Sequence, residues 1–333
     1  MNSQDRASLT MKATTIQGSW AQRYAVLGAV IWAAVAVLAR IGVAPIGAVE
    51  LMFLFAPLVI VPLGMELGRV MGSDTPLTRF ARRIQPVAAT LAVAALWLPP
   101  GRLAGGLACV WMVVCLSMTI AALTDLSSLA RSQPDSSTRS TMQRITVAVA
   151  QVDLSVGGAW LVASRLGLRP MGIQEPIGLL TAVHFHYAGF ATAMIAAAML
   201  QFAALRHEHR WLRWLVAVVI GMPFVVAVGF VISPQLKLAA AAMFSAAVAG
   251  LAVVLRSSTK RLQSRTARAM FYVASATIFA GMVLSTAYAV ADFRGSDVLP
   301  IPQMARTHGI LNAVGFCLPA LLGWLVENAA VSQ

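Results

Sequence analysis

The side chains that could do chemistry stand singly inside otherwise apolar sequence. Carboxyl and imidazole groups in such surroundings can exchange protons or hydrogen-bond a polar solute. Amide, phenol and guanidinium groups near them can orient the same ligand. The candidate site therefore comprises Asp153, His184, His186, Tyr187, Arg306, His308 and Asn312, with Glu50 and Glu175 as additional candidates.

The sequence around these residues is typical of membrane-spanning helices. Hydrophobic residues make up 59% of the 333 residues, charged residues 11%, and the mean hydropathy is +0.78. A soluble domain carries roughly a quarter charged residues, and each membrane span needs ~20 mostly apolar residues. We predict an all-α, polytopic transmembrane bundle of about ten helices, over the runs 24–39, 46–68, 84–98, 103–124, 145–164, 177–204, 214–232, 237–255, 269–291 and 307–326.

The third run, 84–98, is the weakest, and the distribution of charge supports it. With ten spans, most of the 25 lysines and arginines fall in segments on the same side as the N-terminus. Without the third span, most of the charges on the side of the N-terminus would move to the opposite side, against the positive-inside rule. We therefore expect a bacterial inner (plasma) membrane location with both termini in the cytoplasm. Residues 1–23 are expected to be a disordered cytoplasmic segment, and 24–333 a single transmembrane domain.

Several other classes of function are disfavoured. The net charge of +13 resides in short loops, so nucleic-acid binding is not expected. The three cysteines, Cys109, Cys115 and Cys317, lie in apolar runs without a CxxC pair and indicate packing. No P-loop is present, which argues against an ATP-driven pump. No cofactor is expected, and the expected partners are membrane lipids and an unidentified small-molecule or lipophilic substrate.

The depths of the candidate residues suggest one polar site in the outer half of the membrane. Asp153 is expected roughly 18 Å below the outer end of its span, and His184 and His186 roughly 10 and 13 Å below theirs. A short connection joins these two helices. We therefore expect Asp153 and one of the two histidines to form a direct pair. Each residue alone could also be an ordinary interhelical hydrogen bonder or interfacial anchor.

The His184–Phe185–His186 triplet does not predict a metal site. Residues two apart on a helix point about 200° from each other, so the imidazoles should face different neighbours. One should face the fifth helix and the other a different helix, such as the tenth. Gly189, on the face of His186, would allow a close helix approach. The seventh and tenth helices, with Gly221–Met222–Pro223 and Pro319, could be interrupted around a site or simply kinked.

Two segments carry a family resemblance. His184–Phe190 (HFHYAGF), preceded by Leu179–Val183, and Thr307–Phe316 (THGILNAVGF) resemble the YndJ-like family of bacterial membrane proteins, and Gly167–Glu175 (GLRPMGIQE) adds to the match. The resemblance covers roughly residues 150–320 and implies a polytopic membrane protein without supplying a mechanism. The two segments also share a Gly-Phe ending on helices of the same direction, to which we assign no significance. An inverted repeat of five and five spans is topologically allowed, but no residue pattern supports it.

Three functions compete. The leading hypothesis is a secondary transporter or permease for a small solute, with Asp153 and the histidines as titrating or solute-binding groups. The second is a membrane-embedded acid–base enzyme, such as an isomerase, cyclase or hydrolase, acting on a lipophilic substrate. The third is a non-catalytic sensor or assembly subunit. A cavity sealed between bundles would favour the transporter, one open to lipid the enzyme, and tight packing the subunit.

Overall fold

The computed structural model describes residues 20–129, 141–204, 210–296 and 300–331, and within these ranges all regular structure is helical. Ten helices reach spanning length, and nine of them are also apolar enough to cross a membrane. The tenth is α4 (Pro76–Trp97), which corresponds to the weak third run. The predicted all-α polytopic fold is confirmed.

Seven spans are single α-helices and three are composite. The single ones are α1 (Trp20–Arg40), α4 (Pro76–Trp97), α5 (Arg102–Leu129), α6 (Thr141–Leu166), α9 (Arg210–Ile232), α10 (Pro234–Ser258) and α11 (Arg265–Phe293). The second span joins α2 (Ala48–Phe55), the π-helix η1 (Ala56–Ile60) and α3 (Val61–Val70). The sixth joins α7 (Ile177–His184), the π-helix η3 (Phe185–Ala191) and α8 (Thr192–Ala204). The tenth joins α12 (Ile301–Met304), the π-helices η5 (Ala305–Gly309) and η6 (Leu311–Cys317), and α13 (Leu318–Val331). Two short 3₁₀ turns, η2 (Pro170–Gly172) and η4 (Thr259–Arg261), complete the described elements.

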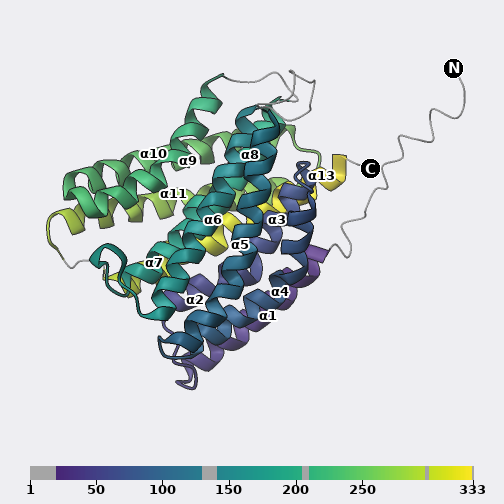
Figure 1. Cartoon of the computed structure of the whole chain (residues 1–333). Coiled ribbons are helices and arrows are strands. Elements are labelled where there is room, and N and C mark those ends of the chain that lie inside the picture. The colour runs from purple at the N-terminus through teal and green to yellow at the C-terminus, as the bar shows by residue number, and fades with distance from the viewer. Residues whose placement is uncertain (1–19, 130–140, 205–209, 297–299, 332–333) are drawn as a thin grey trace, which may run out of the picture.

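Two of the three composite spans, the second and the sixth, lie at the centre of the bundle. The second and sixth spans have the largest buried shares of all the candidate spans. Around them, α5 packs between α4 and α6, α10 packs between α9 and α11, and α1 covers η1 and α3. In Figure 1 the α9–α10–α11 layer stands at the left of the bundle and α1 and α4 at the lower right. The interrupted backbone of the second and sixth spans is therefore enclosed by neighbouring helices, as membrane-embedded backbone requires.

Several boundaries and one interruption differ from the sequence predictions. Residues 1–19 lie outside the described residues, whereas Trp20–Arg23, expected to be disordered, form the first turn of α1. Helix α4 begins at Pro76 rather than at residue 84, because Thr75 caps it and Pro76 fits the first helical position. Helix α9 continues through Pro223, so of the two alternatives for the seventh helix, an interruption or a simple kink, the interruption is wrong.

Proline explains two of the π-helical segments. Pro62 follows η1 and Pro319 follows η6, each two residues after the segment ends. Because proline has no N–H, a carbonyl one turn earlier is left without its helical donor. In the second span the carbonyl oxygen of Pro57 instead accepts a hydrogen bond from Nε2 of Gln85 on α4, at 2.6 Å. A side chain of the third span thus supplies a hydrogen-bond donor that the backbone of the second span lacks.

Changing Gln85 to Met should therefore destabilise the protein. The apolar side chain keeps the length of glutamine but leaves the Pro57 carbonyl buried without a donor, at a cost of about 1–3 kcal/mol. Thermal unfolding in detergent should show the loss. The control is Thr90→Val on the same helix, where an exposed hydroxyl bonds only its own backbone. An equal stability of both variants would contradict the role of Gln85.

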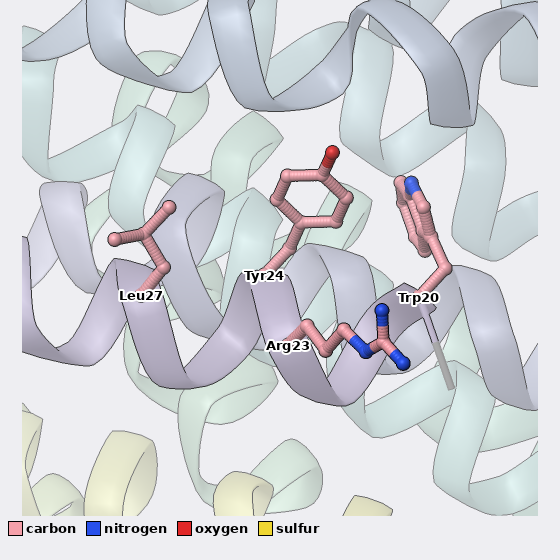
Figure 2. Close-up of a pocket in the computed structure, with 4 residues that line it drawn as sticks. All are labelled: Trp20, Arg23, Tyr24 and Leu27. Atoms are coloured by element: carbon pink, nitrogen blue, oxygen red, sulfur yellow. The ribbon is translucent and has the colours of Figure 1, made fainter. Parts of the chain in front are cut away.

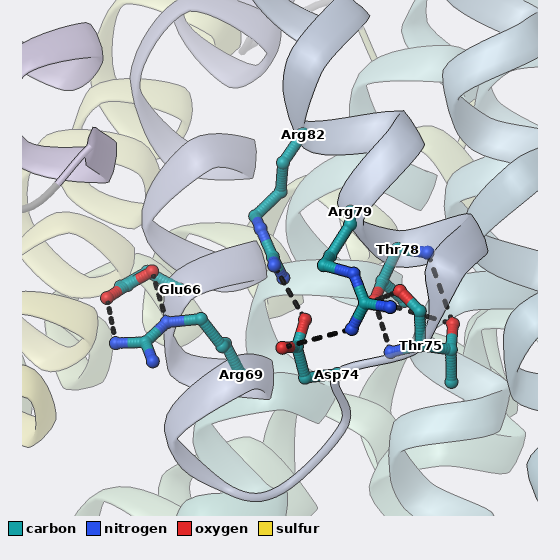
Figure 3. A network of polar contacts seen from close by, with 7 residues as sticks. All are labelled: Glu66, Arg69, Asp74, Thr75, Thr78, Arg79 and Arg82. Carbon is teal, nitrogen blue, oxygen red and sulfur yellow. Dashed lines mark hydrogen bonds and ion pairs between the residues drawn. The ribbon is translucent and has the colours of Figure 1, made fainter.

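The connection between α3 and α4 is held by charge. Oδ1 of Asp74 accepts a hydrogen bond from Nη2 of Arg82 at 2.6 Å, and its Oδ2 lies 3.6 Å from Nη1 of Arg79. Figure 3 shows these residues beside the capping pair Thr75 and Thr78. Partial burial of Asp74 opposes its ionisation, but the hydrogen bond from Arg82 and the nearby arginine charges outweigh it and hold the pKa of Asp74 below its usual value. The charged carboxylate is therefore the form that stabilises this turn.

A pH dependence follows from the lowered pKa of Asp74. The stabilisation is fully present above the unfolded-state pKa near 4 and is lost as the pH falls through the lower folded-state value. Asp74→Asn should be less stable than wild type at pH 7, and the difference in melting temperature should shrink between about pH 4 and pH 2. A difference that stays constant across that range would show that the ionised carboxylate is not the stabilising form.

Candidate functional site

Three interrupted spans meet at one place. The π-helical segments η1, η3 and η6 contact one another, although they come from the second, sixth and tenth spans. A π-helical turn is uncommon and is found frequently at functional sites, because it widens the helix and re-aims the side chains in it. We call the place where η1, η3 and η6 meet the junction, and its residues include His186, Tyr187 and Asn312.

His186 is fully buried between three helices. Nε1 of Trp111, on α5, donates to its Nε2 at 3.1 Å, and Trp111 stacks on the ring. The edge of Phe53 contacts the imidazole from the second span. Since Nε2 accepts, Nδ1 carries the proton and donates to the carbonyl oxygen of Ala182, at 2.8 Å. Both ring nitrogens of His186 are therefore occupied, and it is fixed as a neutral, orienting group.

Asp153 lies on α6, one turn before Gly157, and its side chain is buried against Gly189 of η3. A methyl group added to Gly189 would lie 2.7 Å from Cγ and 2.8 Å from Oδ2 of Asp153. Neither carboxyl oxygen has a hydrogen-bond partner in the described part of the chain. The expected direct pair of Asp153 with a histidine is therefore not formed. His186 faces Gly157 instead, where an added methyl would lie 2.5 Å from Nδ1.

The tenth span contributes a second polar group. Nδ1 of His308 donates to the carbonyl oxygen of Gly281 on α11, and Nδ2 of Asn312 donates to Nε2 of His308, both at 2.8 Å. The amide oxygen of Asn312 is buried against Gly281 and has no partner among the described residues. Asp153 and Asn312 thus each place an unsatisfied oxygen against a glycine.

The two helix pairs around these residues repeat the same arrangement. The second residue of each π-helix, His186 in η3 and Asn312 in η6, packs on a glycine of the preceding span, Gly157 or Gly281. Four residues earlier on that span, Asp153 or Thr277 packs on the fifth residue of the π-helix, Gly189 or Gly315.

A buried phenylalanine follows the glycine in both π-helices, Phe190 and Phe316. The shared Gly-Phe ending thus marks a repeated helix pair in two π-helices of the same direction.

The remaining candidates of the central spans lie around this junction. The Tyr187 hydroxyl donates to the carbonyl oxygen of Met52, at 2.8 Å, and so joins the sixth span to the second. His184 donates through Nδ1 to the carbonyl oxygen of Leu180 and stays exposed, within electrostatic range of His308. The two histidines of the triplet therefore face different neighbours, as predicted: His186 faces α6, and His184 lies near the tenth span.

Three further candidates lie at the expected outer end of the bundle. Oε2 of Glu50 accepts from the N–H of Gly47, and Oε2 of Glu175 accepts from the N–H of Leu179, both at 3.1 Å, so each carboxylate caps a helix start. Arg306 is exposed in η5. The sequence interpretation missed Arg165, which is buried within electrostatic range of both glutamates.

No predicted site residue lines either of the two hollows described next. A hollow of about 420 Å³ lies on the first turns of α1, beside Trp20, Arg23, Tyr24 and Leu27 (Figure 2). This aromatic and basic set is typical of the membrane–water interface. A groove of about 830 Å³ lies between α10 and α11. In the described residues, no group of three or more His, Cys, Asp or Glu side chains is arranged to hold a metal.

Comparison with known proteins gives a family and a curated relative. A family model described as "YndJ-like protein" matches residues 51–316. A Bacillus subtilis (strain 168) protein described as "Uncharacterized membrane protein YndJ" is 31% identical over 189 residues, which are 56% of this chain and 34% of that protein. No solved structure matches. The family match begins in the second span, so it extends beyond the region of about 150–320 in which the sequence motifs lie.

Proposed function

The chain belongs to the YndJ-like family of membrane proteins, and we propose that it is a proton-coupled secondary transporter of a small polar solute. The observation that carries the proposal is the meeting of η1, η3 and η6, where the carboxyl oxygens of Asp153 and the amide oxygen of Asn312 have no partner among the described residues. Interrupted helices that face each other in the middle of a bundle are the usual place for a transported solute. Unsatisfied buried oxygens are costly, and a polar solute would satisfy them.

Closed packing at the junction requires a moving part, and the π-helices supply one. Converting a π-turn to an α-turn removes one residue from the turn and rotates the flanking helix. Gly157, Gly189 and Gly281 offer little side-chain obstruction to that movement, because each faces its neighbour without a Cβ. In this proposal η3 and η6 move against α6 and α11, and Asp153 carries the proton while Asn312 orients the solute.

Cysteine accessibility tests the proposal without knowledge of the solute. In a background with Cys109, Cys115 and Cys317 changed to alanine, Asn312→Cys should react with membrane-impermeant thiol reagents from either side, in right-side-out and in inverted vesicles. Val283→Cys is the matched control, because Val283 lies two residues from Gly281 but is 70% exposed on the outside of the bundle. It should not react with polar reagents from either side.

The other outcomes identify the other functions. Labelling of Asn312→Cys only by lipophilic reagents would favour a membrane-embedded enzyme with an entrance from the lipid. No labelling by any reagent would favour a closed sensor or assembly subunit, which the tight packing around His186 also fits. Either result would exclude alternating access at this junction.

A further inference from the structure

The groove between α10 and α11 lies on the outside of the bundle and separate from the junction. The α11 residues that line it, such as Met282 and Thr286, differ from Thr277 and Gly281, which face η6. On α10 the wall includes Ala242, whose side chain is exposed. The groove thus opens toward the surroundings of the bundle and is independent of the proposed transport site.

The dimensions of the groove match one leaflet of a bilayer. It runs along α11 from Arg294 to Phe279, fifteen residues or roughly 22 Å at 1.5 Å per residue. Half of the ~30 Å hydrocarbon core, together with the adjoining interfacial region, is of this length. Three alanines of α10, Ala242, Ala246 and Ala249, leave the room that larger side chains would fill. The walls are otherwise mostly aliphatic, which suits an acyl chain.

A positive charge, that of Arg294, lies at one end of the groove, which we call its mouth. Arg294 lines the end of the groove and is exposed, and no carboxylate in the described ranges forms an ion pair with it. The nearest acidic neighbour in the chain, Asp292, is bound by Lys237 at 2.6 Å. Arg294 therefore presents a guanidinium that no described carboxylate binds, at the level where Lys237 and Asp292 mark the end of the helices. A guanidinium in this place complements a phosphate.

We propose that this groove binds a phospholipid with an anionic headgroup. An acyl chain lies along the alanines of α10, and the headgroup phosphate contacts Arg294. The competing occupant is a helix from a second copy of the chain. Ser245 is the residue that would favour it, since this residue lines the groove and is 4% exposed, and its hydroxyl has no partner among the described residues. The guanidinium of Arg294 at the mouth favours the lipid.

Native mass spectrometry of the detergent-purified protein tests the assignment. Dioleoyl phosphatidylglycerol should be retained in preference to dioleoyl phosphatidylcholine. Arg294→Gln should weaken that preference about fivefold, as expected for one basic residue at a membrane surface, and Arg294→Lys should retain it. Arg102→Gln is the control, because Arg102 is an exposed arginine at the same end of the bundle outside the groove. Ala246→Phe, which fills the groove, should reduce retention of both lipids.

Two results would overturn the proposal. One is a phosphatidylglycerol preference that is unchanged in Arg294→Gln. The other is a dimer that an Ala246→Cys variant links by an intermolecular disulfide, which would assign the groove to a second copy. Neither result changes the labelling expected at Asn312, so the transport proposal is tested independently of the groove.

Discussion

Replacing Gly28 with alanine should destabilise the protein by about 3 kcal/mol, in the upper range for overpacking in a core. Gly28 of α1 packs directly against the Leu58 carbonyl in η1, and a methyl group there would overlap the backbone of the second span. Because the added Cβ is held rigidly on the backbone of α1 and the atoms that it meets are backbone atoms of Leu58, no side-chain rotation can relieve the overlap. Helix α1 must move away from η1.

Gly221→Ala in α9 is the matched control for this prediction. A methyl group at Gly221 would meet nothing within 4 Å, and the residue lies inside a regular helix. This variant should be unchanged or more stable by up to about 1 kcal/mol, since alanine favours helix. Thermal unfolding of both variants in the same detergent measures the contrast. Equal melting temperatures would show that α1 is not seated on η1 as described.

The number and class of the helices could be predicted from sequence because they follow from simple quantities. Apolar runs of spanning length give the helices, and the positions of arginine supported α4, which nevertheless is not apolar enough to qualify by composition. The divergence of His184 and His186 and the close approach at Gly189 followed from helical geometry and are confirmed. These features depend on one helix at a time.

The junction itself could not be predicted, because it depends on register between helices. A π-turn leaves no periodic signal in an all-apolar run, and Pro62 or Pro319 alone reads equally well as a kink. Depth counted along ideal helices placed Asp153 about one turn from His186, close enough for the expected direct pair with one of the two histidines. Asp153 and His186 instead each face a glycine of the other helix, one turn apart. Trp111, the donor to His186, stands in an apolar run with nothing to single it out. The sequence does contain one signal of this arrangement, because Gly157 follows Asp153 and Gly281 follows Thr277 by the same four residues.

Asp153→Asn should impair the proposed proton-coupled movement without lowering the stability of the protein. Asparagine keeps the shape of the side chain and cannot exchange a proton. Because neither carboxyl oxygen of Asp153 has a partner in the described structure, the change removes no hydrogen bond, and a neutral amide is cheaper to bury than a charged carboxylate. The melting temperature should therefore equal or exceed that of the wild type.

The functional loss should appear in the accessibility of Asn312→Cys. If proton exchange at Asp153 drives the movement of η3 against α6, then Asp153→Asn should hold the junction in one arrangement. The rate of labelling from one side of the membrane should fall about tenfold or more, while labelling from the other side persists. Gln151→Leu is the control, because Gln151 is a buried amide on the same helix whose side-chain atoms also lack partners among the described residues. It should match or exceed the wild-type stability and keep two-sided labelling. Unchanged two-sided labelling in Asp153→Asn would remove Asp153 from the mechanism and leave it as a packing residue against Gly189.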